Sequence, residues 1–484
     1  MQSRQDLPLA QGLWRGEHRL SSASDRSPGP GPALLAGGII AVPAAFHDEL
    51  RRIVGPAHVL TGIECGPYVI EGRTPGAVVA PGSKEDVAAV LVAAGEAGVP
   101  VTPWGGGTAM AVGSPPSRLG LVLLLGRLNR LVEHEPGDLT ATVEAGMTVQ
   151  ALQEALGRRG QWLSLDPPHA AKATIGGTLS ANVAGPRRHL YGGCRDLLIG
   201  LTVVTADGAI VKGGGKVVKN VAGYDLPKLF IGAFGTLGVI VEATLKLRPR
   251  PDADRVVVAR FERLKDAGVA ARTVMASDLL PSALELLDGE AIRALGLGGA
   301  EGAALLVGVD GMADQVDWQC REIERLLEPV GRREARVLDG AERDRLWQAR
   351  GTMGREAFAE TAATMRWVLL PSQVADCMEQ GAAVAQRAGL RAATAAHAGV
   401  GIVEAALGGG EHADLERVAA VLGEWRTLVR GAGGHAVVQW APLAVKERVP
   451  VWDEAGPALR IMERIKAQLD PRGVLNPGRV AGGL

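Results

Sequence analysis

Three short glycine-rich segments in the first half of the chain constrain the fold more than any other feature of the sequence. They span residues 104–108 (WGGGT), 173–185 (ATIGGTLSANVAG) and 235–238 (GTLG). Glycine has no Cβ atom, so such segments let backbone N–H groups approach a ligand or a neighbouring strand closely. Threonine, serine and asparagine side chains add uncharged hydrogen-bonding groups. Together the segments predict a surface of exposed backbone that can bind a large anionic ligand.

A structural interpretation of the same segments stays open. Thr174 can cap a helix whose first turn packs closely through Gly176 and Gly177. Glycines before a strand, as at Gly235, often form only a turn. Three clusters in one part of the chain nevertheless favour a common ligand.

Two widespread nucleotide-binding motifs are excluded. Segment 104–108 leads to Met110 at the position where a Rossmann fingerprint has its third glycine. Residues 213–216 (GGGK) are followed by Val217, where a P-loop has Ser or Thr to bind magnesium. The ligand is therefore expected to bind to a different kind of glycine loop.

Length and composition limit the class of protein. A chain of 484 residues exceeds one hydrophobic core, so two or three lobes are expected. The 52 basic and 53 acidic residues nearly cancel, which gives no electrostatic argument for a nucleic acid or lipid partner. The four cysteines are far apart and form no C-x-x-C pair, which predicts reduced thiols in a cytoplasmic protein and no iron–sulfur or zinc site.

The residue pattern predicts mixed helices and strands. Residues 1–41 lack periodicity and are expected to be a disordered leader, and no segment is long and apolar enough to span a bilayer. Helices are predicted at 45–54, 87–97, 149–156, 264–277, 316–327 and 462–469. Strands are predicted at 77–80, 119–125, 140–144, 255–261 and 304–309, and a hairpin at 199–204 and 209–212.

The order of the motifs resembles a known family. The glycine segments, with Pro81-x-Ser83, Asp166-Pro167-Pro168 and Tyr191-Gly-Gly-x-Arg195-Asp196, resemble FAD-binding flavoproteins of the vanillyl-alcohol oxidase and p-cresol methylhydroxylase type. The resemblance covers roughly residues 42 to 484. Two longer runs, 180–188 (SANVAGPRR) and 215–230 (GKVVKNVAGYDLPKLF), are similar to the FAD-binding E subunits of bacterial glycolate oxidases.

This resemblance implies an α+β fold in three parts. Residues 42–250 would form a p-cresol methylhydroxylase-type FAD-binding domain of two α+β subdomains. Residues 251–440 would form a cap domain for the substrate, with an antiparallel sheet backed by helices. Residues 441–484 would be a C-terminal segment that returns to the FAD lobe.

FAD is the cofactor that the resemblance implies, with its pyrophosphate at the first two glycine segments and its adenosine end at the third. Backbone dipoles would neutralise the pyrophosphate and stabilise the reduced flavin ring. Family members can attach FAD through a histidine or cysteine in or near the first loop, which has neither here, so FAD is expected to bind non-covalently. The expected cofactor residues are Trp104, Gly105, Gly106, Gly107, Thr108, Asp166, Pro167, Thr174, Ile175, Gly176, Gly177, Ser180, Arg195, Gly235, Gly238, Val239, Ile240 and Asn476.

The expected substrate residues lie in the cap. Arg350 and Arg366 match positions where hydroxy-acid relatives bind the substrate carboxylate, and a guanidinium fork suits that group, although a surface salt bridge is an equal alternative for either. Relatives that oxidise 2-hydroxy acids carry a metal-binding His-x-Gly-Asp-Gly-Asn run and a later Glu-His-Gly. Here the first reads 397–402 (HAGVGI) and the second 434–436 (GHA), so no metal is expected. His435 is a candidate base, or a structural histidine.

The combined interpretation is an FAD-binding subunit of a glycolate oxidase-like complex acting on glycolate or D-lactate-type 2-hydroxy acids. Its expected partners are a paralogous FAD-binding catalytic subunit and an iron–sulfur subunit, through which it could be membrane-associated. Lys216 and Lys219 could place positive charge near the flavin or face a partner, or be solvated. Two alternatives stay open: a standalone FAD dehydrogenase of another small hydroxy acid or alcohol, and a non-catalytic subunit that retains flavin.

Overall fold

The computed structural model describes residues 38, 40, 42–215, 224–409 and 414–484. They all belong to one unit of the chain, Pro32–Leu484. Lys216 and Lys219 lie outside the described residues, as does the predicted leader apart from Gly38 and Ile40. Among these residues, no helix is long and apolar enough to cross a membrane.

The first sheet has four strands in the order β1-β2-β4-β3. Strands β2, β4 and β3 are parallel, and β1 pairs antiparallel with β2. The helix that precedes β3 begins at Ser83, whose Oγ accepts a 3.0 Å hydrogen bond from the Asp86 amide, and it ends at Gly98 with a φ of 65°. The cap and the stop predicted from the sequence are therefore confirmed. The elements are α1 (Ala44–Val54), β1 (Val59–Thr61), β2 (Ala77–Val79), α2 (Lys84–Ala97), β3 (Val101–Trp104) and β4 (Leu121–Leu124).

The second sheet is antiparallel, with five strands in the order β5-β6-β10-β8-β9. The predicted hairpin is confirmed as β8 and β9, whose turn places Gly208 at a φ of 82°. Apolar residues of this sheet share a core with α3 and α4. The elements are β5 (Leu131–Glu135), β6 (Thr140–Glu144), α3 (Val149–Gly157), α4 (Ile175–Ala181), β8 (Leu198–Val204), β9 (Ile210–Gly214) and β10 (Val239–Lys246).

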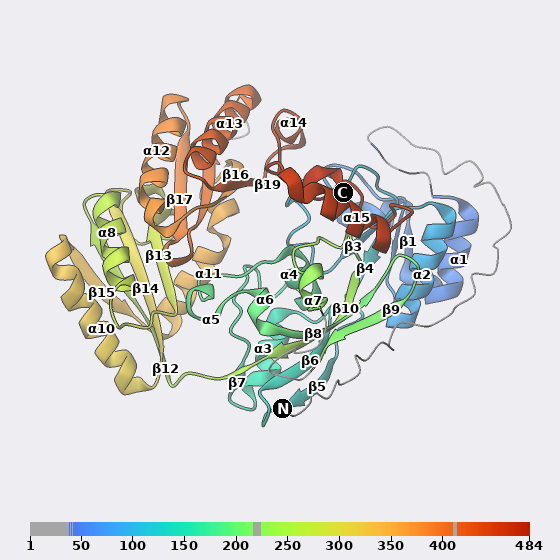
Figure 1. Cartoon of the computed structure of the whole chain (residues 1–484), viewed down its shortest axis with the longest axis horizontal. Coiled ribbons are helices and arrows are strands. Elements are labelled where there is room, and N and C mark those ends of the chain that lie inside the picture. The colour runs from blue at the N-terminus through green and yellow to red at the C-terminus, as the bar shows by residue number, and fades with distance from the viewer. Residues whose placement is uncertain (1–37, 39, 41, 216–223, 410–413) are drawn as a thin grey trace, which may run out of the picture. The chain divides into compact units, whose positions relative to one another are not determined.

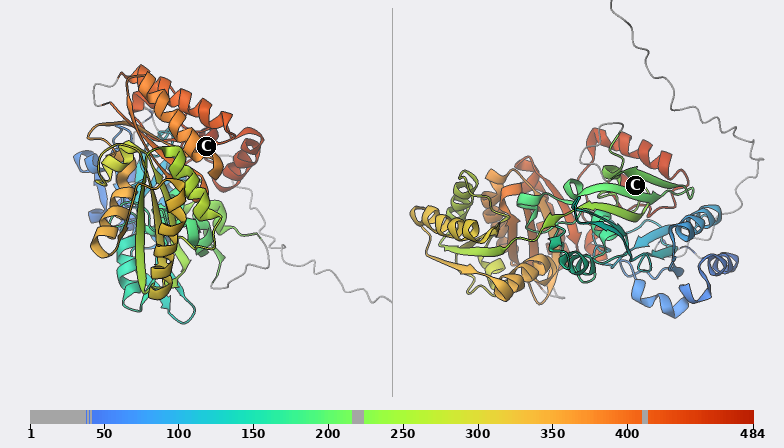
Figure 2. Two further views of the ribbon diagram at one scale, coloured as in Figure 1. Left: turned by 90° about the vertical axis from the view of Figure 1, so that its left-hand side faces the viewer. Right: turned by 90° about the horizontal axis from the view of Figure 1, so that it is seen from below.

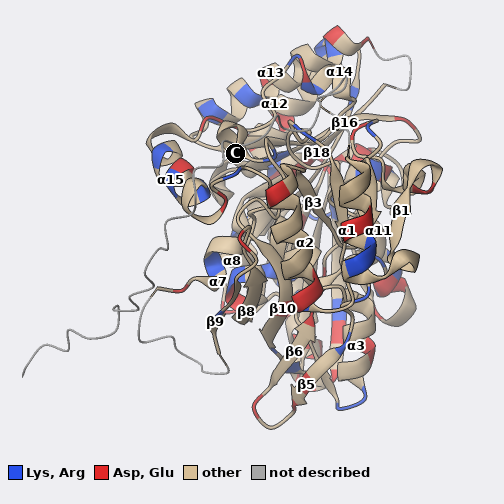
Figure 3. Cartoon of the chain, turned by 90° about the vertical axis from the view of Figure 1, so that its right-hand side faces the viewer, with Lys and Arg blue, Asp and Glu red and all other residues tan. Residues whose placement is uncertain are grey.

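Short elements connect the second sheet to the rest of the chain. The two-residue strands β7 and β11 pair antiparallel with each other. On α1, Arg51 and Arg52 pair with Asp48 and Glu49 one turn earlier. Figure 3 shows both basic and acidic positions along this helix. The short elements are β7 (Gln161–Trp162), α5 (Arg188–Tyr191), α6 (Cys194–Leu197), α7 (Pro227–Phe230) and β11 (Arg248–Pro249).

An antiparallel sheet follows with eight strands in the order β15-β12-β14-β13-β17-β18-β16-β19. Side chains that alternate along each strand belong to two hydrophobic cores, one on each face of the sheet. In β12, Val257 and Ala259 share one core with α8, α10, α12 and α13. Val256 and Val258 share the other core with α9 and α11. Figures 1 and 2 show these helices packed on the sheet. The elements are β12 (Ala253–Phe261), α8 (Leu264–Met275), β13 (Ala283–Leu287), α9 (Gly289–Ala294), β14 (Ala303–Gly311), α10 (Ala313–Leu327), β15 (Glu334–Leu338), α11 (Gly340–Glu356), β16 (Thr361–Val368), α12 (Val374–Arg387), β17 (Arg391–His397), β18 (Ile402–Gly408), α13 (Leu415–Gly431) and β19 (His435–Trp440).

The end of the chain packs beside the first sheet. After α14 (Leu443–Lys446) and α15 (Leu459–Leu469), the Val101 amide donates to the Val474 carbonyl and the Val101 carbonyl accepts from the Asn476 amide. Buried Lys466 fixes the intervening turn by donating to the Asp470 carboxylate at 2.6 Å. The tail therefore extends the sheet next to β3. The domain boundaries given above stay a proposal.

Candidate functional site

A cavity lies where all three glycine segments meet, with about 650 Å³ of empty space when the open solvent at its mouth is included. It brings together twelve of the eighteen residues predicted at the cofactor and seven other residues. The tail reaches it as well, through Asn476 and Arg479. The full lining is Pro103, Gly105, Gly106, Gly107, Thr108, Ala109, Met110, Leu125, Gly176, Gly177, Ser180, Ala181, Phe234, Gly235, Gly238, Val239, Ile240, Asn476 and Arg479.

The first loop presents free backbone amides to this cavity. Within the described residues, the amides of 105–110 donate no hydrogen bond to the protein. Successive unpaired N–H groups form a concave site for an anion. The loop therefore has the chemistry expected for a phosphate-bearing ligand.

The same glycines also pack closely against their own protein. A Cβ atom added at Gly105 would lie 2.2 Å from the Thr174 Oγ1, and one at Gly106 would lie 1.7 Å from the Lys172 carbonyl oxygen. Gly107 has a φ of 75°, which side chains rarely adopt. The structural interpretation of these glycines is thus confirmed by their close packing, and the ligand-binding interpretation stays a prediction.

The second segment contributes a smooth surface and a hydroxyl group. Thr174 caps α4, since its Oγ1 accepts from the Gly177 amide at 3.2 Å, and the Gly176 amide donates to the Ala145 carbonyl. These amides are therefore occupied by the protein. Gly176 and Gly177 present bare backbone to the cavity, where Ser180 adds a polar side chain.

Arg479 is a residue of the cavity that the sequence interpretation did not assign. It is 1% exposed, and its guanidinium donates to the carbonyls of Ser114 at 2.8 Å and of Met110. Burial lowers the pKa of Arg479 to about 10, and nearby Glu71 opposes that shift. The sequence signal was present in the closing Asn-Pro-Gly-Arg motif, but its burial beside the first loop depends on the folded tail.

Asn476 ties the tail to two of the cavity walls. Its Nδ2 donates to the Phe234 carbonyl at 2.7 Å, and its Oδ1 accepts from the Thr102 hydroxyl at 3.3 Å. The backbone adopts a φ of 40°, a conformation that asparagine tolerates better than most residues. Asn476 therefore joins β3 and the third glycine segment at the cavity.

Other residues predicted at the cofactor lie outside the cavity lining. Trp104 packs edge-on against Tyr68, with ring centroids 5.5 Å apart. Arg195 donates to the Lys228 carbonyl at 3.4 Å. The Thr174 side chain caps α4, and the Asp166 carboxylate accepts a hydrogen bond from the Arg187 amide. The remaining two are Pro167 and Ile175, both buried.

A buried ionic cluster lies in the eight-stranded sheet and α11. Arg350 is 1% exposed and donates at 2.7 Å to each of two carboxylates, those of Glu285 and Glu404. Glu404 also faces Arg366, with 3.5 Å between Oε1 and Nη2. Burial alone would raise the pKa of Glu404, but the two arginines and His397 hold it at about 2. The ion pairs of Arg350 are therefore buried and do not lie at the surface. Its two carboxylate partners occupy most of its hydrogen-bond donors, so few donors remain for a substrate.

Two guanidinium nitrogens in this cluster lack partners. Among the described residues, the Nη2 of Arg350 and the Nε of Arg366 are buried and make no hydrogen bond. Unpaired buried donors are costly and uncommon in native proteins. The cluster therefore retains the capacity to bind an anion.

The two predicted histidines have opposite surroundings. His397 is 3% exposed, and its Nδ1 lies 2.6 Å from the Glu285 carboxylate. The His435 side chain is 75% exposed at the start of β19, with its Nδ1 3.6 Å from Asp453. His435 is outside the cavity and the ionic cluster, so its placement gives no support for a role as base. No group of metal-ligating side chains is present in the described part of the chain.

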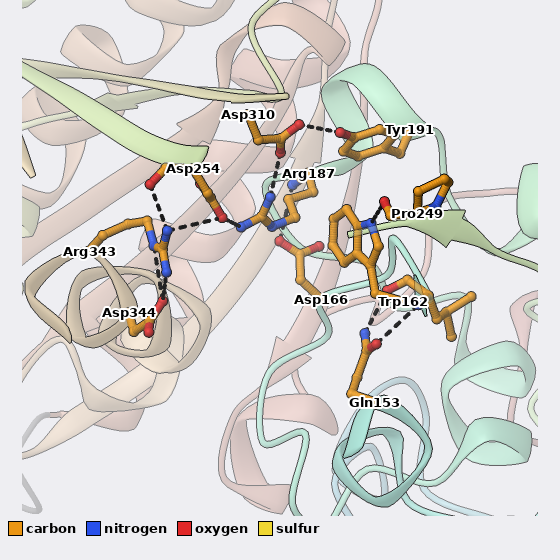
Figure 4. Close-up of polar contacts among 11 residues, drawn as sticks. Gln153, Trp162, Asp166, Arg187, Tyr191, Pro249, Asp254, Asp310, Arg343 and Asp344 are labelled. Carbon is orange, nitrogen blue, oxygen red and sulfur yellow. Dashed lines mark hydrogen bonds and ion pairs between the residues drawn. The ribbon is translucent and has the colours of Figure 1, made fainter. Parts of the chain in front are cut away.

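The loop after α4 reaches the eight-stranded sheet through Arg187. Its guanidinium donates to Asp310 at 2.6 Å and to Asp254 at 2.5 Å, and its backbone amide donates to Asp166 at 3.1 Å (Figure 4). The Arg187 guanidinium also lies 5.0 Å from the centre of the Trp162 ring. These contacts fix the loop that follows Ser180 and Ala181 of the cavity against strands β12 and β14.

Comparison with known proteins agrees with this geometry. Residues 75–214 match a family model described as an FAD binding domain, and residues 250–480 match the C-terminal domain of FAD linked oxidases. The chain is 30% identical over 423 residues to glycolate oxidase subunit GlcD of Bacillus subtilis (strain 168), which covers 84% of this chain and 89% of that protein. It is also 30% identical over 454 residues to D-lactate dehydrogenase of Archaeoglobus fulgidus, covering 90% and 99%.

Solved structures confirm the predicted α+β fold. p-Cresol methylhydroxylase with substrate bound superimposes with a TM-score of 0.71 at 17% identity, over 90% of this chain and 96% of that one. Alkyldihydroxyacetonephosphate synthase gives a TM-score of 0.70 at 18% identity, over 94% and 90%.

Proposed function

The chain belongs to the FAD-linked oxidases and is an FAD-dependent oxidoreductase, and on that premise we propose that it oxidises small 2-hydroxy acids such as glycolate or D-lactate. The observation that carries the proposal is the convergence of the three glycine segments on one cavity. Two buried guanidinium nitrogens without a hydrogen-bond partner among the described residues, Nη2 of Arg350 in α11 and Nε of Arg366 in β16, suit a carboxylate substrate.

The cavity residues fit FAD. The free amides of 105–110 and the buried cation of Arg479 offer donors and positive charge to a pyrophosphate. Gly176 and Gly177 present a flat backbone surface to the flavin ring, and Asn476 and Ser180 supply polar groups. No histidine or cysteine occurs among the described lining residues, which supports non-covalent attachment.

When bound, FAD supplies a two-electron oxidant. The chain's own residues would hold the substrate carboxylate at the arginine cluster and remove the hydroxyl proton. His397 is better placed for that proton than His435, because Glu285 orients its Nδ1 and leaves the Nε2 to accept the proton. His397 would thus accept the proton of the substrate hydroxyl group, and FAD, when bound, would supply the oxidising capacity for the carbon that carries it.

The working arrangement in this proposal is a complex like glycolate oxidase. A paralogous flavoprotein subunit and an iron–sulfur subunit would carry electrons away, in the cytoplasm or at a membrane that the partners contact. The relation to glycolate oxidase subunit GlcD supports this arrangement. Two other functions are retained: a standalone dehydrogenase of another hydroxy acid or alcohol, and a partner subunit that binds flavin without turnover.

Anaerobic mixing distinguishes these functions. The purified yellow chain is mixed alone with glycolate, D-lactate or a neutral alcohol, and the visible flavin absorption is followed. Rapid bleaching by a hydroxy acid supports turnover by this chain. A flavin that stays oxidised with every hydroxy acid alone, but is reduced after the partner subunits are added, supports the non-catalytic role. Bleaching by the alcohol instead would contradict a 2-hydroxy-acid substrate.

A further inference from the structure

Lys446 is a buried cation that binds the turn after the first glycine loop. It is the last residue of α14, the short helix that follows β19 of the eight-stranded sheet. Its side chain is 0% exposed, and its Nζ donates to the carbonyls of Ala111 at 2.7 Å and of Gly113 at 3.1 Å. It also donates to the Glu71 carboxylate at 2.5 Å. Lys446 therefore holds the chain directly after the free amides of 105–110.

Arg479 binds the same turn from the end of the chain. Its guanidinium donates to the carbonyls of Ser114 at 2.8 Å, of Ala109 at 3.4 Å and of Met110. In a trans peptide unit the carbonyl and the N–H group point in opposite directions, so fixing the carbonyl also fixes the direction of that N–H group. The two cations thus determine the shape of the turn that ends the loop.

The two buried cations share one carboxylate. Glu71 is paired with Lys446, whereas the hydrogen bonds of Arg479 to described residues all go to backbone carbonyls. Burial lowers the pKa of Lys446, an effect that Glu71 opposes and that Arg479 increases. Lys466, by contrast, has its own carboxylate partner, Asp470, at 2.6 Å. A buried charge without a counter-ion is costly, so the turn has an excess positive charge that a bound anion would balance.

We propose that Lys446 is a positioning residue for FAD, which holds the first glycine loop in the shape in which its free amides bind the pyrophosphate. Lys446 is not among the lining residues of the cavity, so it acts through the carbonyls of Ala111 and Gly113 and not on the ligand directly. The role rests on the FAD site of the proposed function and is independent of the substrate. It also makes the loop depend on the segment that leaves the eight-stranded sheet at β19.

The test is fluorescence titration of the flavin-free protein with FAD, followed by phosphorus NMR of the FAD-saturated protein. Lys446→Met keeps an unbranched side chain and removes the charge and the donors, so FAD affinity is expected to fall about tenfold or more. The pyrophosphate resonances are expected to shift from their wild-type positions. Lys446→Arg is expected to lie between the two proteins, because its guanidinium still donates to carbonyls but is wider than an ammonium group.

Arg448→Met is the matched control. Arg448 lies two residues after Lys446 and is exposed, and its ion pair with Glu416 at 3.0 Å involves no glycine segment. The control removes a cation from the same part of the chain. It is expected to match the wild type in FAD affinity and in phosphorus resonances.

Wild-type FAD affinity in Lys446→Met would overturn the proposal. Weaker binding with wild-type phosphorus resonances would overturn it too, because a purely structural residue would lower affinity without moving the phosphates. Thermal unfolding of each variant identifies loss of fold. If Lys446→Met does not fold, Lys446→Arg decides, and wild-type affinity with wild-type resonances in that variant would refute the role.

The positioning role and the proposed function fail separately. FAD binding that depends on Lys446, without flavin reduction by any hydroxy acid, keeps the role and removes the proposed function. Flavin reduction by glycolate in a Lys446→Met protein that binds FAD as the wild type does would have the reverse meaning.

Discussion

Asn476 donates a 2.7 Å hydrogen bond from its Nδ2 to the backbone carbonyl of Phe234, which lies 242 positions earlier in the chain. This bond ties the C-terminal tail to the third glycine segment at the cavity. The tail is therefore a wall of the proposed FAD site.

Asn476→Ala is expected to weaken FAD binding about tenfold and to lower the free energy of unfolding by about 1–2 kcal/mol, because two hydrogen bonds are lost. Asn476→Gly removes the side chain without straining the backbone, because glycine accepts the φ of 40°. This variant therefore tests the contribution of the side chain alone. Fluorescence titration with FAD and denaturant unfolding of the apoprotein provide the two measurements. Unchanged FAD affinity in the glycine variant would show that the side chain has no role at the cofactor.

Gly106→Ala is expected to disrupt the first loop, because the new methyl group would lie 1.7 Å from the Lys172 carbonyl oxygen. FAD affinity should fall at least about tenfold, which corresponds to about 1.4 kcal/mol. Gly126→Ala is the control, since nothing lies within 4 Å of an added methyl group there. Equal FAD affinity in the two variants would contradict this account of the loop.

The free energy of unfolding is expected to depend on pH because of Asp166. Burial raises the pKa of Asp166 to about 6 from an ordinary 3.8, against the opposing effect of Arg187. The folded protein thus favours the protonated carboxyl group, so the contribution to stability is full below about pH 4 and is lost as the pH rises through 6.

Asp166→Asn removes this titration and keeps an oxygen that can accept from the Arg187 amide. The variant is expected to be more stable than the wild type at pH 8, by about 1–3 kcal/mol, and to lose this advantage near pH 4. Denaturant unfolding across this range measures the difference. The exposed Asp252→Asn should show no such trend. An Asp166→Asn protein less stable than the wild type at pH 8 would refute the raised pKa.

His397→Asn is expected to lower kcat for a 2-hydroxy acid by about a hundredfold or more, because the proposed proton acceptor is removed. Glu285→Gln should lower it less and shift the pH profile, since Glu285 orients the imidazole. Flavin content should stay the same in both variants. A comparable loss of rate in His435→Asn, with His397→Asn active, would instead support the base predicted from the sequence.

Local sequence signals predicted much of the fold. Ser83 and Gly98 mark the ends of α2, and the Asp207-Gly208 turn marks the β8–β9 hairpin, because caps and turns depend on neighbouring residues. The glycine segments were also visible. Their order, compared with a known family, indicated that they meet at FAD.

Local sequence signals could not predict where the cationic residues lie in the folded chain. Arg479 and Arg350 are buried by segments far away in the chain, and nothing in a local pattern distinguishes them from exposed arginines. The same holds for His397 and His435, which look alike in sequence but differ in burial. Which cations lack partners depends on the long-range pairing of Glu285 and Glu404.

The central claim is that the glycine-lined cavity binds FAD, and equilibrium titration of the flavin-free chain with FAD tests it most directly. Saturation at about one FAD per chain, with a bound flavin spectrum and release of intact FAD on denaturation, is the predicted result. A correctly folded chain that takes up no FAD would contradict the account.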